Sequence, residues 1–123
     1  MNLHTLDYVI LLCEDLARMK AFYNETLGFP VERDWEDWIE MRAGAVLLTL
    51  RRRGRSYDGR KSPDAASVQL AFRVAPAEVD ACHTQLIQKQ VEILEAPRDQ
   101  VYGHRTLFFK DPEGNILEIY ADI

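Results

Sequence analysis

The feature of this sequence that most constrains its fold is the repetition of one pattern of elements in its two halves. In each half, a short apolar strand precedes a helix, and three further strands follow. The first half has its expected strands at 8–13, 31–35, 38–42 and 45–50. The second half has them at 68–74, 91–94, 106–109 and 116–120. A period of about 60 residues predicts two like units that bury each other's apolar faces.

Capping and turn residues stand where this pattern needs them. Asp15 precedes apolar residues at helical spacing, so its carboxylate can cap the first helix. Gly28 follows that helix where a left-handed residue is wanted, and Pro30 blocks its continuation. Pro76 suits the first turn of the second helix. The run DPEGN at 111–115 is typical of a turn between the last two strands.

Alternation along the strands assigns their two faces. Val9, Leu11 and Cys13 share one side of the first strand, and the later strands place Leu70, Phe72, Leu107, Phe109, Leu117 and Ile119 on the equivalent side. The opposite side gathers polar groups. The sequence therefore predicts an α+β fold of two tandem βαβββ modules whose curled mixed sheets form a cup. One domain over 1–123 is expected, with module 1 at about 1–60 and module 2 at about 66–123.

Charge and composition restrict the partners. The chain has 123 residues, 47% of them hydrophobic, and a net charge of −5. We expect no nucleic acid and no membrane as partner, because phosphate binding is driven by clustered Lys and Arg. The stretch 51–61 is an exception, with six basic residues and one Asp. It is either a solvated loop or a contact for an anion or a partner.

The cysteines and the N-terminal residues bear on the compartment. Cys13 and Cys82 are too few for a disulfide framework, and both lie in apolar periodic segments. The first residues lack the basic and apolar regions of a secretion signal, and no apolar run approaches about 18 residues. We therefore expect a cytoplasmic protein.

Three stretches together resemble the vicinal oxygen chelate superfamily. They are EDLARMKAFYNETLGF at 14–29, SVQLAFRV at 67–74 and HRTLFFKDPEGNILEIY at 104–120. This superfamily includes glyoxalase I, extradiol dioxygenases, fosfomycin-resistance enzymes and bleomycin-resistance proteins. The resemblance implies the glyoxalase/bleomycin-resistance/dioxygenase fold, a small-molecule ligand in the cup, and a homodimer.

The resemblance also implies four positions for metal ligands, two in each module. The first falls on Tyr8, where a His is expected, and the second on Leu48 or Thr49. The third falls on Gln69, and only the fourth, Glu118, matches the family pattern. Divalent ions held by N and O donors need roughly three or four good ligands. We therefore expect no metal and no other cofactor, with a bound divalent ion as the disfavoured alternative. His4 is a poor substitute, because it lies about 13 Å from Tyr8 along a strand.

Glu118 and His104 are the candidate catalytic residues. A buried carboxylate needs a partner, which for Glu118 is a cation such as Arg73, a Tyr or Gln side chain, or a ligand donor. Without a cation nearby, its pKa would rise and it would serve as a general base. His104 is the natural acid or base near neutral pH, or else a strand-end residue at the rim.

Further side chains on the polar face are candidates for ligand binding. The full predicted set is Tyr8, Trp38, Arg42, Gln69, Arg73, Tyr102, His104 and Glu118. Trp38 offers an aromatic wall to a planar ligand, or packs across a dimer seam. The guanidinium groups of Arg42 and Arg73 could bind a carboxylate or phosphate, whereas Arg105 has the parity of the other face and is expected at the surface.

Three functions follow from these residues. The leading hypothesis is a metal-independent small-molecule binding protein of the bleomycin-resistance type. The alternative is a glyoxalase-like lyase, isomerase or dioxygenase in which Glu118, with His104 or a bound divalent metal, moves a proton next to a carbonyl. The third is a dimerisation module whose cup is filled by its own side chains. Fold analogy alone does not choose between them.

Overall fold

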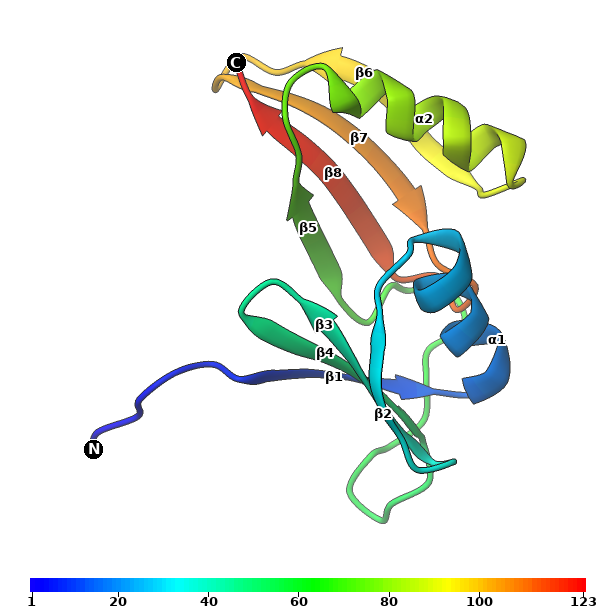
Figure 1. The fold of residues 1–123 in the computed structure, drawn as a ribbon. Coiled ribbons are helices and arrows are strands. Elements are labelled where there is room, and N and C mark those ends of the chain that lie inside the picture. The colour runs from blue at the N-terminus through cyan, green and yellow to red at the C-terminus, as the bar shows by residue number, and fades with distance from the viewer. The chain divides into compact units, whose positions relative to one another are not determined.

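The computed structural model describes residues 1–123 and divides them into two compact units. Unit 1 is Met1–Arg60 and unit 2 is Lys61–Ile123. Each unit contains one strand, a helical segment and three further strands, as Figure 1 shows. The predicted βαβββ order is therefore confirmed in both halves of the chain.

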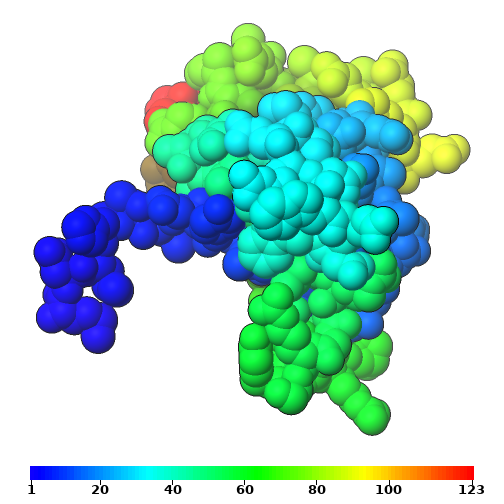
Figure 2. Space-filling model, turned by 60° about the horizontal axis from the view of Figure 1, so that its bottom comes forward, coloured from blue at the N-terminus to red at the C-terminus, as the bar shows by residue number.

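Unit 1 is a four-stranded sheet with one helical segment. Its elements are β1 (Tyr8–Cys13), α1 (Leu16–Ala21), η1 (Phe22–Thr26), β2 (Val31–Asp34), β3 (Trp38–Ala43) and β4 (Val46–Arg52). The strand order is β1-β4-β3-β2, and β1 runs parallel to β4 while the other pairs are antiparallel. Ahead of β1, the N-terminal residues extend from the sheet as an exposed arm (Figure 2). His4 lies in this arm, outside the strand.

The predicted caps of the first helix are present, but its second half differs from the expected regular α-helix. The Asp15 carboxylate accepts a hydrogen bond from the backbone N–H of Arg18 at 3.1 Å. Gly28 ends the segment with a φ of 84°, in the left-handed region. Between them, η1 is a π-helical turn, in which Leu27 N–H donates to the carbonyl of Phe22 at 3.0 Å. The wider turn still buries both Phe22 and Tyr23.

Unit 2 repeats the plan with a longer helix. Its elements are β5 (Gln69–Arg73), α2 (Glu78–Gln88), β6 (Ile93–Asp99), β7 (His104–Lys110) and β8 (Ile116–Asp122). The strand order is β5-β8-β7-β6, with β5 parallel to β8. Pro76 lies in the turn just before α2, where Glu78 N–H donates to the Ala75 carbonyl at 2.9 Å. β6 begins later and runs further than expected, with register shifts against β7 that accommodate Pro97.

One face of each sheet forms the core, as the alternation predicts. On this face of the sheet in unit 1, the buried strand residues are Leu11, Cys13, Ile39, Met41, Leu48 and Leu50. In unit 2, they are Leu107, Phe109, Leu117, Ile119 and Ala121. Met19 of α1 and Leu86 of α2 are buried too. The opposite side of each sheet, called here its open face, carries the candidate site residues.

The DPEGN turn is built around one carboxylate. Asp111 Oδ1 accepts the backbone N–H groups of Glu113 at 2.9 Å and Asn115 at 3.0 Å, and Oδ2 accepts the Asn115 side-chain amide at 2.8 Å. Gly114 has a φ of 84°, which a side chain would strain. The turn joins β7 to β8 and so fixes the register of the two strands that carry His104 and Glu118.

Candidate functional site

The open face of unit 1 brings together an aromatic pair and a carboxylate. Strand pairing places Tyr8 in register with Leu47, Thr49 with Glu40, and Arg51 with Trp38, all on one side of the sheet. The Tyr8 and Trp38 rings meet across this face, with centroids 6.2 Å apart and planes tilted by 52°. The predicted position of Trp38 on the open face is therefore confirmed by the register.

Glu40 completes this aromatic pair, and we call Tyr8, Trp38 and Glu40 the aromatic platform. The indole N–H of Trp38 donates to Glu40 Oε2 at 2.8 Å. Glu40 is only 6% exposed, so this hydrogen bond orients the indole from a nearly buried carboxylate. A flat, partly exposed ring held in this way gives a planar ligand a preformed stacking surface.

Arg42 lies on the same open face, and its guanidinium already has a partner. It donates to both oxygens of Glu32, from Nε and from Nη2, at 3.0 Å each. This two-point hydrogen bond lowers the pKa of the Glu32 carboxyl. A ligand carboxylate or phosphate would have to displace Glu32, an exposed partner whose ion pair is weak in water.

The open face of unit 2 places Glu118 beside Gln69. The Gln69 amide donates to Glu118 Oε1 at 3.4 Å, which is a long hydrogen bond. Arg73 is in register with Tyr120, two residues beyond Glu118, and its guanidinium contacts Asp122. The prediction that Arg73 pairs with Glu118 is therefore wrong. The parallel register of β5 with β8 places Arg73 beside Tyr120, and its guanidinium contacts Asp122 instead.

His104 and Glu118 share this face but lie at opposite ends of it. His104 is in register with Asp122, and Phe108 is in register with Glu118. Four residues separate the two positions along each strand, or about 13 Å at about 3.3 Å per residue. Two side chains can exchange a proton directly only when they lie within hydrogen-bonding distance of each other. His104 and Glu118 are too far apart for this, so they do not form a joint acid–base pair.

His104 instead belongs to a cluster at the end of the sheet. Its Nε2 lies 3.1 Å from Asp122 Oδ1, and its ring stacks on Tyr120 with centroids 4.7 Å apart. Tyr102 packs edge-on against the imidazole at 5.3 Å, and the guanidinium of Arg73 lies over the Tyr120 ring at 5.1 Å. We call these five side chains the His104 cluster.

Arg105 follows His104 in β7 and therefore points to the opposite face of the sheet. Its side chain is less exposed than expected. Its guanidinium donates to Asp80 of α2 at 2.9 Å and to Asp99 of β6 at 2.8 Å. It therefore ties the helix to the sheet on the side away from the candidate site. This role is structural.

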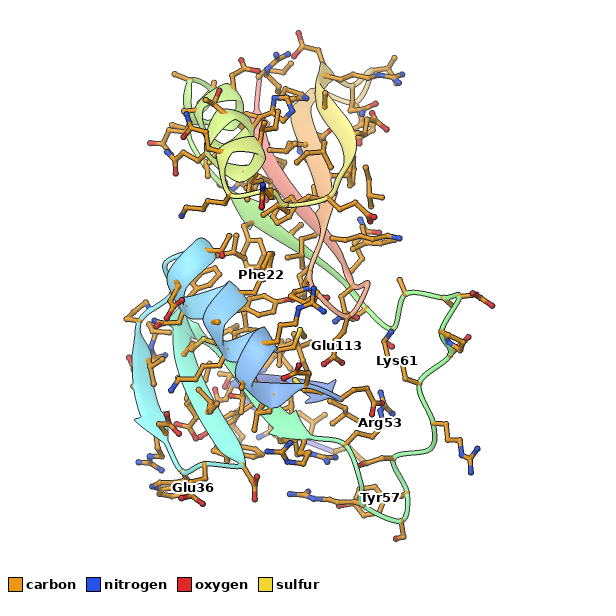
Figure 3. All side chains as sticks on the ribbon, turned by 90° about the vertical axis from the view of Figure 1, so that its right-hand side faces the viewer. Phe22, Glu36, Arg53, Tyr57, Lys61 and Glu113 are labelled. Atoms are coloured by element: carbon orange, nitrogen blue, oxygen red, sulfur yellow. The ribbon has the colours of Figure 1, made fainter.

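The basic stretch 51–61 begins with the last two residues of β4 and continues as a loop arranged around Asp58. Arg51 donates to both carboxylate oxygens of Asp58, at 2.9 and 2.7 Å, and the backbone N–H groups of Gly54 and Arg55 donate to Oδ2. These contacts, the Arg51 guanidinium first, hold the pKa of Asp58 well below its usual range. Tyr57 lies at the tip of the loop, as Figure 3 shows, and is 76% exposed.

The four positions that correspond to the family's metal ligands carry a weak donor set. The strand register resolves the second position in favour of Thr49, because Leu48 faces the core. Thr49 is fully buried, and its hydroxyl donates to the carbonyl of Leu47 at 3.1 Å. The set is thus a phenol, a hydroxyl, an amide and one carboxylate. Zinc, nickel, iron and manganese sites use imidazole, thiolate and carboxylate ligands, so these residues do not fit such an ion.

The sequence and the fold were compared with those of known proteins. The family model of the Glyoxalase/Bleomycin resistance protein/Dioxygenase superfamily matches residues 5–119. The uncharacterized protein YwkD of Bacillus subtilis is 32% identical over 132 residues, covering 98% of each chain. Virulence protein STM3117 of Salmonella typhimurium is 24% identical over 97% of this chain and 85% of the relative.

Solved structures share the fold. A glyoxalase/bleomycin resistance protein/dioxygenase from Nocardioides superposes with a TM-score of 0.86 at 21% identity, covering all of this chain and 86% of the other. The structure of STM3117 gives a TM-score of 0.77 and covers both chains completely. The chain therefore belongs to the Glyoxalase/Bleomycin resistance protein/Dioxygenase superfamily, a class of proteins that bind small molecules. None of its helices has the length and apolarity needed to cross a membrane.

Glu40, Tyr120 and Asp122 are the residues of these two clusters that the sequence did not single out. Alternation along β3 and β8 is enough to place Glu40 and Tyr120 on the open face. Their partners were not evident, because a side-chain hydrogen bond depends on register and rotamer. Asp122 lay beyond the expected end of the last strand. A longer β8 with the same alternation would have placed it beside His104.

Proposed function

We propose that this protein is a metal-independent small-molecule binding protein, similar in type to bleomycin-resistance proteins. The observation that carries the proposal is the aromatic platform: two partly exposed rings in contact, one of them held by a nearly buried carboxylate. Such a surface suits a planar, largely apolar ligand that stacks on Trp38 and leaves its polar edge near Glu40. The weak donor set at the metal positions supports a mechanism without an ion.

Binding on this platform would be driven by stacking and burial of apolar surface. A ring stacked on an aromatic side chain gains roughly 0.5–1.5 kcal/mol beyond the area it buries. Loss of the Trp38 ring should therefore weaken binding by at least about 10-fold, counting both the stacking and the lost apolar area. Tyr8 within the platform and Arg42 beside it would contribute to selectivity. Within unit 2, Gln69 and Glu118 offer a hydrogen-bond acceptor and donors to a polar group of a ligand.

Tryptophan fluorescence gives a direct test. Trp35, which is exposed under the guanidinium of Arg33, is replaced in the variant Trp35→Phe, so that Trp38 is the only indole. A library of planar aromatic compounds is then titrated. We expect at least one compound to change Trp38 emission saturably and to raise the melting temperature. Tyr8→Ala should weaken its binding at least 10-fold, whereas Tyr57→Ala, in the exposed loop, should not. The absence of any such compound would contradict the proposal and favour a plain dimerisation module.

An enzyme remains the second candidate, because Glu118 accepts only one long hydrogen bond within unit 2. A carboxylate so placed is available to take a proton next to a carbonyl, as a lyase, isomerase or dioxygenase of this superfamily requires. Loss of turnover in Glu118→Gln with unchanged ligand binding would establish this reading. Equal turnover by the variant and the natural protein would rule out a catalytic role for Glu118 and leave ligand binding as the proposed function.

We also propose that the protein is a cytoplasmic homodimer. Neither cysteine forms a disulfide; Cys13 lies in the core and Cys82 is half-buried, which suits a reducing compartment. Light scattering coupled to size-exclusion chromatography should give twice the 14.2 kDa chain mass. A single-chain mass at micromolar concentration would contradict the dimer.

A further inference from the structure

The His104 cluster has the parts of a proton-accepting site that is separate from the aromatic platform and from Glu118. Imidazole is the side chain best suited to exchange protons near neutral pH. Here its ring is fixed from three directions: Asp122 at Nε2, Tyr120 across one face and Tyr102 at an edge-on contact. A histidine that served only to end a strand would not need a carboxylate and two aromatic rings around it.

We propose that His104 is a general base and that Asp122 is its positioning residue. Asp122 Oδ1 lies 3.1 Å from Nε2, and a carboxylate at this position favours the neutral imidazole that carries its hydrogen on Nε2. Nδ1 is then left with its lone pair, ready to accept a proton. Asp122 is itself fixed, because its other oxygen contacts the guanidinium of Arg73. The carboxylate stabilises the imidazolium that forms after proton transfer.

The charges around the imidazole are compatible with this role. Asp122 and Arg73 compensate each other's charge within the same open face. On the neighbouring strands, Arg105 faces the other side of the sheet, where Asp80 and Asp99 hold it. Gln100, whose backbone N–H donates to the His104 carbonyl, is uncharged. The His104 side chain is 33% exposed, so a small molecule can reach the ring.

The chemical class of substrate follows from the aromatic surroundings. A planar, conjugated molecule can stack beside Tyr102 and present an acidic C–H bond to the imidazole edge. In the step, Nδ1 takes the proton and the electron pair of the C–H bond passes into the conjugated system of the substrate. The imidazolium then returns its proton to water or to the product. No oxidant, reductant or metal ion takes part in this step.

A simple carbon acid, 5-nitrobenzisoxazole, serves as the probe. Removal of its C–H proton forms a carbon–nitrogen triple bond, breaks the N–O bond and releases a coloured nitrophenolate. We expect the natural protein to accelerate this reaction over buffer, and His104→Gln to lose at least 10-fold of that acceleration, since general bases contribute roughly 10²–10⁴-fold. His83→Gln, on α2, is the matched control and should keep the full rate. An unchanged rate in His104→Gln, or no acceleration by the natural protein, would overturn the proposal.

The positioning role of Asp122 has a spectroscopic test that does not depend on turnover. In mildly alkaline buffer, nitrogen-15 NMR distinguishes the protonated from the unprotonated nitrogen of each neutral imidazole. We expect His104 to have its hydrogen on Nε2 in the natural protein and a mixture of both forms in Asp122→Ala. The signals of His4 and His83 should stay the same. A mixture at His104 in the natural protein, or no change in Asp122→Ala, would refute the assignment. This test stands even if His104→Gln folds poorly, and neither experiment depends on ligand binding at Trp38.

Discussion

The substitution Asp111→Ala should destabilise unit 2 because it removes the carboxylate around which the DPEGN turn is built. The side chain is nearly buried and accepts three hydrogen bonds, two from backbone N–H groups and one from the Asn115 amide. At a net value of about 1 kcal/mol for each, the free energy of unfolding should fall by about 3 kcal/mol. With an unfolding entropy of roughly 2.1 cal/mol/K per residue, the melting temperature should fall by about 12 °C.

Asp111→Asn provides the matched control. Its amide oxygen can still accept the two backbone N–H groups. Its NH₂ group can donate to Asn115 if the Asn115 amide rotates, because Asn115 Oδ1 is buried without a hydrogen-bond partner. We therefore expect a loss of about 1 kcal/mol or less. Urea unfolding followed by circular dichroism measures both variants. A loss of under about 1 kcal/mol in Asp111→Ala, or equal losses in the two variants, would refute this account of the turn.

Three further predictions concern unit 1. The pKa of Asp58 is lowered in the folded state by Arg51, so its stabilising contribution is present at neutral pH and disappears as the pH falls below about 4. The difference in stability between the natural protein and Asp58→Asn should narrow over that range in acid titrations; a constant difference would contradict it. Leu50→Ala, at a fully buried position, should cost about 3 kcal/mol in urea unfolding. Gly28→Ala, at a φ of 84°, should lower the free energy of unfolding by roughly 1–2 kcal/mol, and Gly28→Asn should lower it by less. Equal losses in the two variants would argue against backbone strain at this position.

Much of the fold could be predicted because its signals are local. Alternation along strands decides which side chains enter the core, and it correctly separated Leu117 and Ile119 from Glu118 and Tyr120. The caps at Asp15 and Gly28 depend only on nearby residues. The π-helical turn at 22–26 could not be predicted from the sequence. One wider turn alters the spacing of apolar residues too little to distinguish it from the spacing of a regular α-helix.

The candidate site was less predictable because its contacts depend on register between strands far apart in the sequence. Alternation placed His104 and Glu118 on one face, but only the pairing of β7 with β8 shows that they lie about 13 Å apart. The same register directs Arg73 to Asp122 instead of Glu118. The conformation of the basic loop likewise depends on contacts with Asp58. Asp58 is the only acidic residue in a stretch with six basic ones, so the composition of the stretch did not point to it.

The measurement that tests the central claim most directly is the metal content of the purified, untagged protein. The protein is dialysed separately against zinc, nickel, iron(II) and manganese, freed of unbound ion and analysed by elemental mass spectrometry. The proposed function predicts far less than one ion per chain, the same content in Glu118→Gln, and ligand binding at Trp38 that survives a chelator. Stoichiometric retention of one ion, lost in Glu118→Gln, would contradict it and make Glu118 a metal ligand.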